Sequence, residues 1–223
     1  PRFSPDYKSI LYLSYQGDRP RIYVYDLASN KQRLVTESPN QTFSPRWSPD
    51  GKTILYSMSV GGNTDIFSVS AGGGEPRRLT SDPGIETGGS FSPDGKKIVF
   101  ESDRSGTQQV YVMNADGGEQ QRISFGGGQH ATPEWSPRGD LIAFTKMGGG
   151  QFRIGVMTPT GGNERLLTNA WQDEAPTWAP NGRVIVFGRE APGGAAGNRS
   201  RLYSVDITGY NLREVATPQE GSD

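Results

Sequence analysis

The stretch Arg46-Trp47-Ser48-Pro49-Asp50-Gly51-Lys52 decides the fold, because versions of it occur five times in the 223 residues. The other copies span residues 2–8, 90–96, 134–140 and 177–183. Their prolines at positions 5, 49, 93 and 137 are 44 residues apart, and the last, at 180, follows after 43. A fixed period in the forties with several short strands in each unit is typical of a β-propeller. The repeat therefore predicts one body of similar units stacked on one another.

Each repeat contains four short strand-like segments that are separated by turns. The first segment ends in the aromatic-Ser/Ala-Pro element, and the Pro, Asp and Gly residues then favour a tight turn. The second and third segments are apolar at consecutive positions, as expected where both faces of a sheet are covered. No stretch has a sustained 3.6-residue apolar period, so no helix is predicted. The predicted fold class is all-β, a β-propeller of four-stranded antiparallel blades.

The repeat boundaries place the blades at about 1–36, 43–80, 87–124, 131–168 and 174–217. The aromatic residues at positions 3, 47, 91, 135 and 178 are expected to pack between adjacent blades. In the first copy Tyr7 takes the place of the turn glycine. We expect that turn to differ from the others, because positive φ strains a non-glycine residue. Residues 190–200 are expected to form a loop inserted into the last blade.

The composition excludes several classes of function. The chain has 23 basic and 24 acidic residues, a net charge of −1 and no basic run, so the sequence predicts no nucleic-acid partner. It has no cysteine, which excludes a disulfide framework, a thiolate metal site and a cysteine nucleophile. The longest apolar runs have four or five residues, far fewer than a membrane span requires, so membrane insertion is not predicted.

No catalytic residues are predicted. The sequence contains no Gly-x-Ser-x-Gly motif, and His130 is its only histidine, so a Ser–His–Asp triad within the chain is not expected. Residues 126–131 fit the G-x-G-x-x-A pattern of dinucleotide-binding proteins. They lead into a predicted strand and not into a helix that could receive a pyrophosphate, so we interpret them as a loop between blades.

No cofactor and no resident metal are predicted. The single histidine excludes a His-based metal cluster. Glu86, Asp173 and Glu174 precede predicted innermost strands, where a propeller's channel opens, and such carboxylates could hold a Ca²⁺-type cation. No Asp-x-Asp-x-Asp loop supports this alternative, and solvated acidic side chains are the favoured interpretation.

These repeats resemble the WD40-like (PD40) repeats of the TolB family, the periplasmic β-propeller component of the bacterial Tol–Pal envelope system. The resemblance covers nearly the whole chain. It rests on the five aromatic-Ser/Ala-Pro elements, the turn at 102–106 and the segment 110–118 that continues into 121–124. It implies an N-terminal α/β domain followed by six blades, the last closed by a strand from the C-terminus. We therefore expect a fragment with five blades of six, without the N-terminal domain and the closing blade.

The resemblance also implies a function, that of a non-catalytic periplasmic scaffold for protein–protein interaction. In this family the loops that lead into the innermost strands form the rim of the channel. The rim receives the peptidoglycan-associated lipoprotein, and the protein works with other Tol proteins in outer-membrane integrity and cell division. The matching partner-binding positions are Gln41, Thr42, Ser44, Ile85, Glu86, Thr87, His130, Ala131, Thr132, Asp173, Glu174 and Ala175.

Two other functions remain open at this point. Similar blades form the substrate-gating propeller of prolyl-oligopeptidase-like serine peptidases, whose catalytic domain would lie outside this chain. Similar blades also occur in oligosaccharide-binding propellers with a lyase activity. That activity would need clustered histidine and basic residues at the rim, and these are scarce here.

Overall fold

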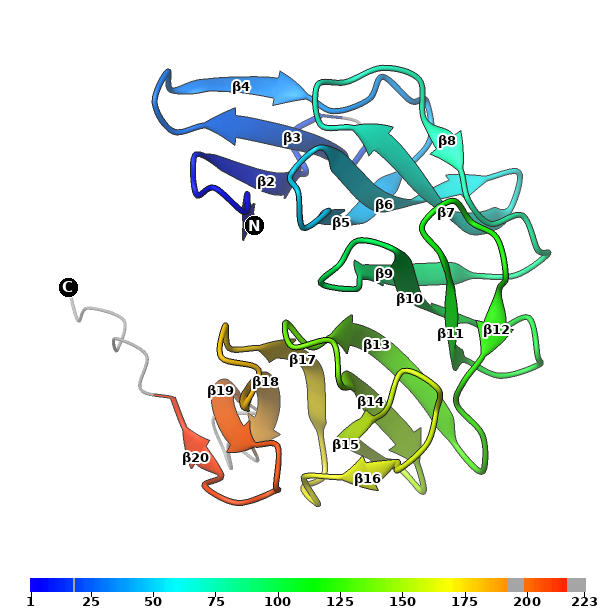
Figure 1. Ribbon diagram of the computed structural model, residues 1–223, viewed down its shortest axis with the longest axis vertical. Helices are drawn as coiled ribbons and strands as arrows, with labels where there is room; N and C mark the ends of the chain where they lie inside the picture. Colours follow the sequence, from blue (N-terminus) through cyan, green and yellow to red (C-terminus); the bar gives the residue numbers. More distant parts are fainter. Residues whose placement is uncertain (18, 192–198, 216–223) are drawn as a thin grey trace. The chain divides into compact units, whose positions relative to one another are not determined.

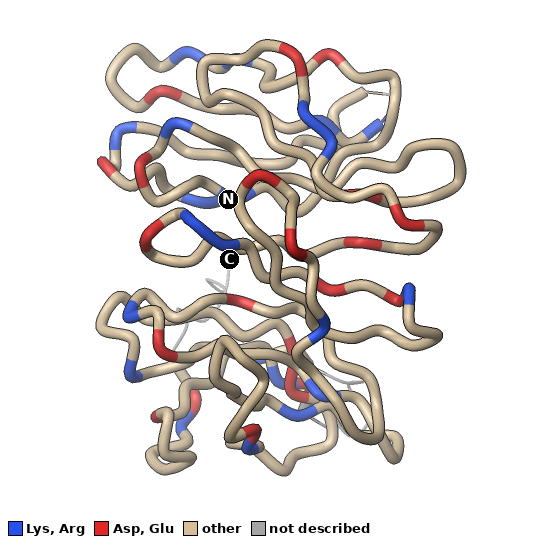
Figure 2. Tube along the Cα trace, turned by 45° about the vertical axis from the view of Figure 1, so that its right-hand side comes forward, with Lys and Arg blue, Asp and Glu red and all other residues tan. Residues whose placement is uncertain are grey.

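The computed structural model describes residues 1–17, 19–191 and 199–215. These residues contain twenty β-strands and no helix. The strands form five antiparallel four-stranded sheets, each built from strands consecutive in the chain (Figure 1). Figure 2 shows acidic and basic residues interspersed along the trace. The prediction of an all-β propeller with five four-stranded blades is confirmed.

The strands of each blade run from the innermost to the outermost in chain order. The first blade contains β1 (Arg2–Phe3), β2 (Ser9–Ser14), β3 (Arg21–Asp26) and β4 (Lys31–Leu34). The second contains β5 (Thr42–Trp47), β6 (Thr53–Val60), β7 (Asn63–Ser70) and β8 (Arg77–Arg78). The third contains β9 (Glu86–Phe91), β10 (Lys97–Ser102), β11 (Gln109–Asn114) and β12 (Gln121–Arg122).

The other two blades follow the same plan. The fourth contains β13 (Gln129–Trp135), β14 (Ile142–Gly148), β15 (Gln151–Met157) and β16 (Arg165–Leu166). The fifth contains β17 (Asp173–Trp178), β18 (Val184–Ala191), β19 (Arg199–Asp206) and β20 (Arg213–Glu214). Most of the expected inserted loop, residues 192–198, lies outside the described residues. The chain divides into two compact units, Pro1–Ser124 with three blades and Phe125–Asp223 with two.

Apolar side chains fill the space between neighbouring blades inside each unit. On β6, Ile54 and Tyr56 belong to the core shared with the first blade, whereas Leu55 belongs to the core shared with the third. Successive residues of a strand point to opposite faces, so one strand supplies both cores. This explains the continuous apolar runs in the sequence. In the second unit, Ile185 and Phe187 of β18 pack against residues of the fourth blade.

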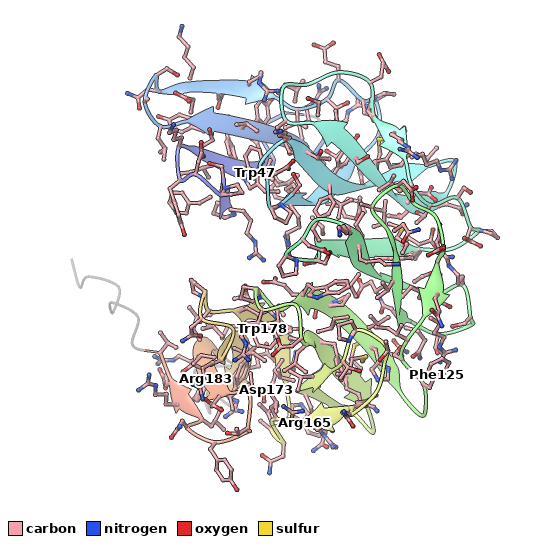
Figure 3. The ribbon with its side chains drawn as sticks, in the orientation of Figure 1. Trp47, Phe125, Arg165, Asp173, Trp178 and Arg183 are labelled. Atoms are coloured by element: carbon pink, nitrogen blue, oxygen red, sulfur yellow. The ribbon has the colours of Figure 1, made fainter. Side chains whose placement is uncertain are left out.

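The aromatic residue at the end of the innermost strand joins two blades. The Nε1 atom of Trp47 donates a hydrogen bond to the carbonyl oxygen of Arg2 in the first blade (3.3 Å). The Nε1 atom of Trp178 donates to the carbonyl oxygen of Glu134 in the fourth blade (3.0 Å; both tryptophans are labelled in Figure 3). Phe91 packs against the core between the second and third blades. The expected packing between blades is confirmed for these three residues.

Arginines of the outermost strands connect blades in a second way. Arg33 donates to the carbonyl oxygen of Ala71 in the next blade. Arg77 donates to the carbonyl oxygen of Asp116 (2.8 Å). In the second unit, Arg165, labelled in Figure 3, donates to the carbonyl oxygen of Ile207 (3.0 Å). In each case the acceptor is backbone in the turn between the third and fourth strands of the following blade.

The Ser-Pro-Asp-Gly-Lys turn is held by its own polar groups. The Ser48 hydroxyl donates to Oδ1 of Asp50 (2.6 Å) and accepts a hydrogen bond from the Thr53 amide (2.9 Å). The Lys52 amide donates to the same Asp50 oxygen (3.0 Å). Gly51 has a φ of +69°, which glycine adopts without strain. Equivalent hydrogen bonds surround the carboxylates of the first and third turns.

The expectation that Tyr7 changes the first turn is wrong. Tyr7 adopts a φ of +59°, and its amide donates to the Ser4 carbonyl (2.9 Å) as the Gly51 amide does to Ser48 (2.9 Å). A left-handed conformation costs a non-glycine residue about 1–2 kcal/mol. The hydrogen bonds around Asp6 hold the turn against that cost, and the Tyr7 side chain is 71% exposed, so it meets no obstacle.

These turns predict an acid-sensitive contribution to stability. The Ser48 hydroxyl, followed by the Lys52 amide, lowers the pKa of Asp50 below its ordinary value, and Asp94 has the same environment. A pKa that is lower in the folded state means that ionised Asp50 and Asp94 stabilise the fold at neutral pH. That stabilisation is lost as the pH falls from about 4 through the lowered pKa.

The double variant Asp50→Asn/Asp94→Asn should therefore have a lower free energy of unfolding at pH 7 and a flatter decline below pH 4. Urea denaturation between pH 2 and pH 7 measures both effects. Glu75→Gln is the control, because the described residues give Glu75 no hydrogen bond. A double variant with the same pH profile as the parent chain would contradict the prediction.

Candidate partner-binding site

Four innermost strands, β5, β9, β13 and β17, share a β-bulge. In β5, Thr42 pairs with Met58 and Trp47 pairs with Ile54. The β5 pair is therefore five residues apart and the β6 pair only four, so β5 contains one extra residue. This is the definition of a bulge. The same shift occurs in the other three strands, each time between the buried polar residue and the aromatic residue.

The bulge decides which way the first side chains of these strands point. Met58 and Ile54 are four residues apart on β6, so they share one face of the sheet. Their partners Thr42 and Trp47 therefore share that face too. In a regular strand, residues five apart would lie on opposite faces. The residues equivalent to Thr42 are Glu86, His130 and Asp173. All four are between 0% and 3% exposed.

The extra residue has a left-handed backbone. Ser44, Thr132 and Ala175 have φ values of +52°, +49° and +54°, and Gly88 occupies the equivalent position with +70°. A proline follows each of the three non-glycine residues. Positive φ is unusual for any non-glycine residue and a clear outlier for β-branched Thr132. Such strain persists only where the surroundings hold it, and it is frequent at functional sites.

Thr145 supports this strained backbone in the second unit. Its hydroxyl is 2.8 Å from the Thr132 hydroxyl of the same blade. It also accepts a hydrogen bond from the Ala175 amide of the next blade (3.2 Å). Thr145 is 2% exposed, whereas Thr132 and Ala175 are exposed, so the link is only partly shielded from water. One buried hydroxyl therefore connects two of the strained positions.

Asp173 is neutralised by an arginine of its own blade. Arg189 Nε lies 2.6 Å from Oδ1 of Asp173, and Arg189 Nη2 lies 2.8 Å from Oδ2. The Arg189 guanidinium also stacks over Tyr203, 4.5 Å from the ring centroid, and over Phe187 at 5.6 Å. The hydrogen bond with Asp173 raises the pKa of Arg189 further. An arginine that makes two hydrogen bonds to one carboxylate and also stacks on aromatic rings forms a strong ion pair.

Glu86 has a similar but weaker environment in the first unit. The Ser102 hydroxyl donates to its Oε1 (2.8 Å), and Arg104 Nη2 lies 3.5 Å from the same oxygen. Arg104 stacks over Tyr111 and Phe100, as Arg189 does over its aromatic pair. Burial nevertheless raises the pKa of Glu86, against the effects of the hydroxyl and the guanidinium. A buried carboxylate with imperfect pairing is less readily ionised.

His130 is buried beside a charged pair. Its ring centroid lies 5.1 Å from that of Phe144. Nε2 is 3.2 Å from a carboxylate oxygen of Glu164, and the other oxygen of Glu164 pairs with Lys146. Phe144 stands opposite Gly155, whereas the equivalent residues of the other blades stand opposite an aromatic. The His130 ring thus provides the aromatic contact that Gly155 cannot.

The predicted partner-binding positions fall into three groups by exposure. The buried ones are Thr42, Glu86, His130, Ala131 and Asp173. Ser44 and Thr87 are half-buried. The exposed ones are Gln41, Ile85, Thr132, Glu174 and Ala175. Their role in binding a partner stays a prediction, and only the half-buried and exposed groups could contact one directly.

Sequence reasoning missed the residues that support these positions. The repeated Pro or Gly after positions 44, 88, 132 and 175 was a visible signal for the bulge. Arg104 and Arg189 give no comparable signal, because their partners are distant in sequence.

Trp171, 64% exposed, precedes β17, and a methyl group added to Gly150 would lie 3.7 Å from its indole ring. Among the residues that the structure describes, no three His, Asp or Glu side chains form a metal-binding group.

Removing Arg189 should destabilise the chain strongly. Arg189→Ala leaves Asp173 buried without its cation, which should cost about 3–5 kcal/mol of unfolding free energy. The control is Arg201→Ala, because the Arg201–Glu214 pair is exposed on both sides and such pairs contribute about 1 kcal/mol or less. Urea denaturation at pH 7 measures both. Equal losses in the two variants would show that burial of the Asp173 pair is unimportant.

Relieving the backbone strain at the bulge should raise the free energy of unfolding, whereas removing Arg189 lowers it. Ala175→Gly removes a left-handed cost of about 1–2 kcal/mol, against an entropic cost of glycine of about 0.5–1 kcal/mol. The variant should therefore gain up to about 1.5 kcal/mol of unfolding free energy in urea denaturation. The reverse change, Gly88→Ala, should lose a similar amount. A destabilised Ala175→Gly chain would show that the alanine methyl group has a packing role.

Comparison with known proteins agrees with the repeat and the sheet order. The family described as the TolB beta propeller domain matches residues 1–222. The Tol-Pal system protein TolB of Rhizorhabdus wittichii is 63% identical over 60 residues, 27% of this chain and 13% of that protein. TolB of Zymomonas mobilis is 62% identical over 60 residues, 27% of this chain and 12% of that protein. These matches therefore span only a small part of the relatives' length.

Solved structures extend the likeness to nearly the whole chain. TolB from Acinetobacter baumannii has a TM-score of 0.85 and 30% identity, over 97% of this chain and 53% of that one. A putative TolB from Agrobacterium tumefaciens has a TM-score of 0.81 and 26% identity, over 96% and 78%. A puromycin hydrolase shares the fold alone, at 18% identity and a TM-score of 0.73 over 99% and 38%.

None of the residues that the structure describes belongs to an apolar helix of the length that crossing a membrane requires.

The family match over residues 1–222, the five blades and the TolB structures with TM-scores above 0.8 all indicate the same family. The chain belongs to the TolB β-propeller domain family.

Proposed function

We propose that this chain is the propeller of a Tol-Pal system protein and acts as a non-catalytic interaction scaffold in the periplasm. Its partner is the peptidoglycan-associated lipoprotein, which binds at the loops leading into the innermost strands and at the first residues of those strands. Through that contact, and together with other Tol proteins, the chain supports outer-membrane integrity and cell division. The names of the relatives support membership of the Tol-Pal system.

The observation that carries the proposal is the repeated left-handed residue at the start of four innermost strands. Ser44, Thr132 and Ala175 keep a strained backbone although glycine would relieve it, as the equivalent Gly88 does. The inference from strain to function is a general one, because rigid, strained backbone presents groups in a fixed arrangement. The buried positions beside them, such as Asp173, serve this arrangement by anchoring the strand.

The exposed side chains around these strands suit a protein partner. Ile85 in the first unit is 50% exposed and lies one residue before β9, and Trp171 in the second unit is 64% exposed and lies two residues before β17. Thr132 and Glu174 add polar groups. Interfaces between proteins typically combine a few large apolar anchors with a polar surround.

The proposal includes neither catalysis nor a cofactor. His130, the one histidine, packs against Phe144 and Glu164 inside a blade. Asp173 and Glu86 already face arginines of their own blades, so a bound cation is not part of the proposal. The likeness to the peptidase and lyase propellers is at 16–18% identity and extends to the fold only.

Ile85→Glu tests the proposed surface. A charge at this half-exposed apolar position should weaken binding of the peptidoglycan-associated lipoprotein at least about tenfold, since a few residues carry most of the energy of an interface. Leu27→Glu is the matched control: Leu27 is 40% exposed in the turn between β3 and β4, at the other end of its blade. Calorimetric titration gives the Kd of each, and a thermal melt verifies folding. Equal affinities for parent and Ile85→Glu chains would refute the proposed surface.

A further inference from the structure

A cleft of about 560 Å³ lies between the second and third blades, at the end where the Ser-Pro-Asp-Gly turns are. This is the opposite end of β9 from Glu86. Its lining residues come from both turns and from neighbouring strands: Ser48, Pro49, Asp50, Thr53, Ser68, Arg77, Phe91, Pro93, Asp94, Gly95 and Ala115. Clefts of about 300–1,000 Å³ are the size that small molecules occupy.

The cleft coincides with a difference between the repeats. The innermost strands of the second and fifth blades end in Trp47 and Trp178, whose indoles reach across to the preceding blade. The third blade has Phe91 at this position, and Phe91 lines the cleft. A phenyl ring is smaller than an indole and has no N–H to donate to the preceding blade. The aromatic residue at this junction therefore makes no such hydrogen bond, and Phe91 adds an apolar group to the lining of the cleft.

Three charged groups line the cleft, and each is held in place. Asp50 and Asp94 receive hydrogen bonds from Ser48 and Ser92 through Oδ1 (2.6 Å each). Within the part of the chain that the structure describes, the second oxygen of each carboxylate accepts no hydrogen bond. Arg77 is fixed by its hydrogen bond to the Asp116 carbonyl (2.8 Å). Fixed groups lose little conformational freedom when a ligand binds, which favours affinity.

We propose that this cleft binds a basic amino acid, of the lysine or arginine type. Two carboxylates on the lining match the two cationic groups of such a molecule, and the Arg77 guanidinium matches its carboxylate. The lining carries one net negative charge and the ligand one net positive charge, so the whole is neutral. The aliphatic part of the ligand lies over Phe91. The proposal is independent of lipoprotein binding, because it uses the other end of the blades.

Calorimetric titration of the purified chain with L-lysine tests the proposal. Two truncated probes separate the charge contacts: 1,5-diaminopentane lacks the carboxylate, and norleucine lacks the side-chain cation. Each should bind at least about tenfold more weakly than lysine, because each loses one charge-assisted hydrogen bond. Absence of lysine binding at millimolar concentration would overturn the proposal. So would equal binding of diaminopentane, which would exclude a role for Arg77.

Variants locate the site. Asp50→Asn/Asp94→Asn should weaken lysine binding at least about tenfold. Asp6→Asn is the matched control, since Asp6 makes the same turn contacts but does not line the cleft. Phe91→Trp should fill the cleft and abolish binding while the chain stays folded by thermal melting. Binding that persists in Phe91→Trp, or that Asp6→Asn weakens equally, would place any lysine site elsewhere and overturn the proposal.

Discussion

In the second, third and fifth blades, the innermost strand must satisfy two demands with one backbone. The aromatic residue at its end has to reach the preceding blade, and the polar residue near its start has to be buried on the same face. Strand geometry alternates faces with every residue, and the five-residue separation would place the two side chains on opposite faces. One extra residue in the bulge restores the agreement. The strained residues and the buried polar positions both follow from that adjustment.

The buried polar residue near the start of the innermost strand differs from blade to blade, and so does the group that satisfies it. Thr42 donates to the carbonyl oxygen of Pro20, Asp173 takes a bidentate arginine, and Glu86 shares a more distant one. Burying a polar group is costly unless a partner is present. The partners of Asp173 and Glu86 come from their own blades, and that of Thr42 comes from the blade before it. Such local solutions allow four different residue types at one structural position.

Much of the fold was predictable from the repeat. The proline spacing of 44 residues and the turn chemistry gave the number of strands, their order and the absence of helices in the described residues. The turn at Tyr7 was not predictable, because hydrogen bonds of Ser4 and Asp6 outweigh the cost of its backbone. For the candidate site, the sequence indicated the region but not the burial of Glu86 or His130. Burial of these residues depends on which face of the strand they lie on. Faces alternate with every residue, so the one extra residue of the bulge moves them to the other face.

The contacts between blades have a further consequence for how such a chain changes over generations. Trp47, Trp178, Arg77 and Arg165 all reach a backbone carbonyl of the neighbouring blade and not a side chain. A carbonyl oxygen is present whatever the residue. The receiving blade can therefore accept substitutions without losing the contact, and a duplicated or exchanged repeat arrives with its acceptors already in place. These four hydrogen bonds do not depend on the side chains of the receiving blade, which leaves the turns that accept them free to acquire their own surface residues.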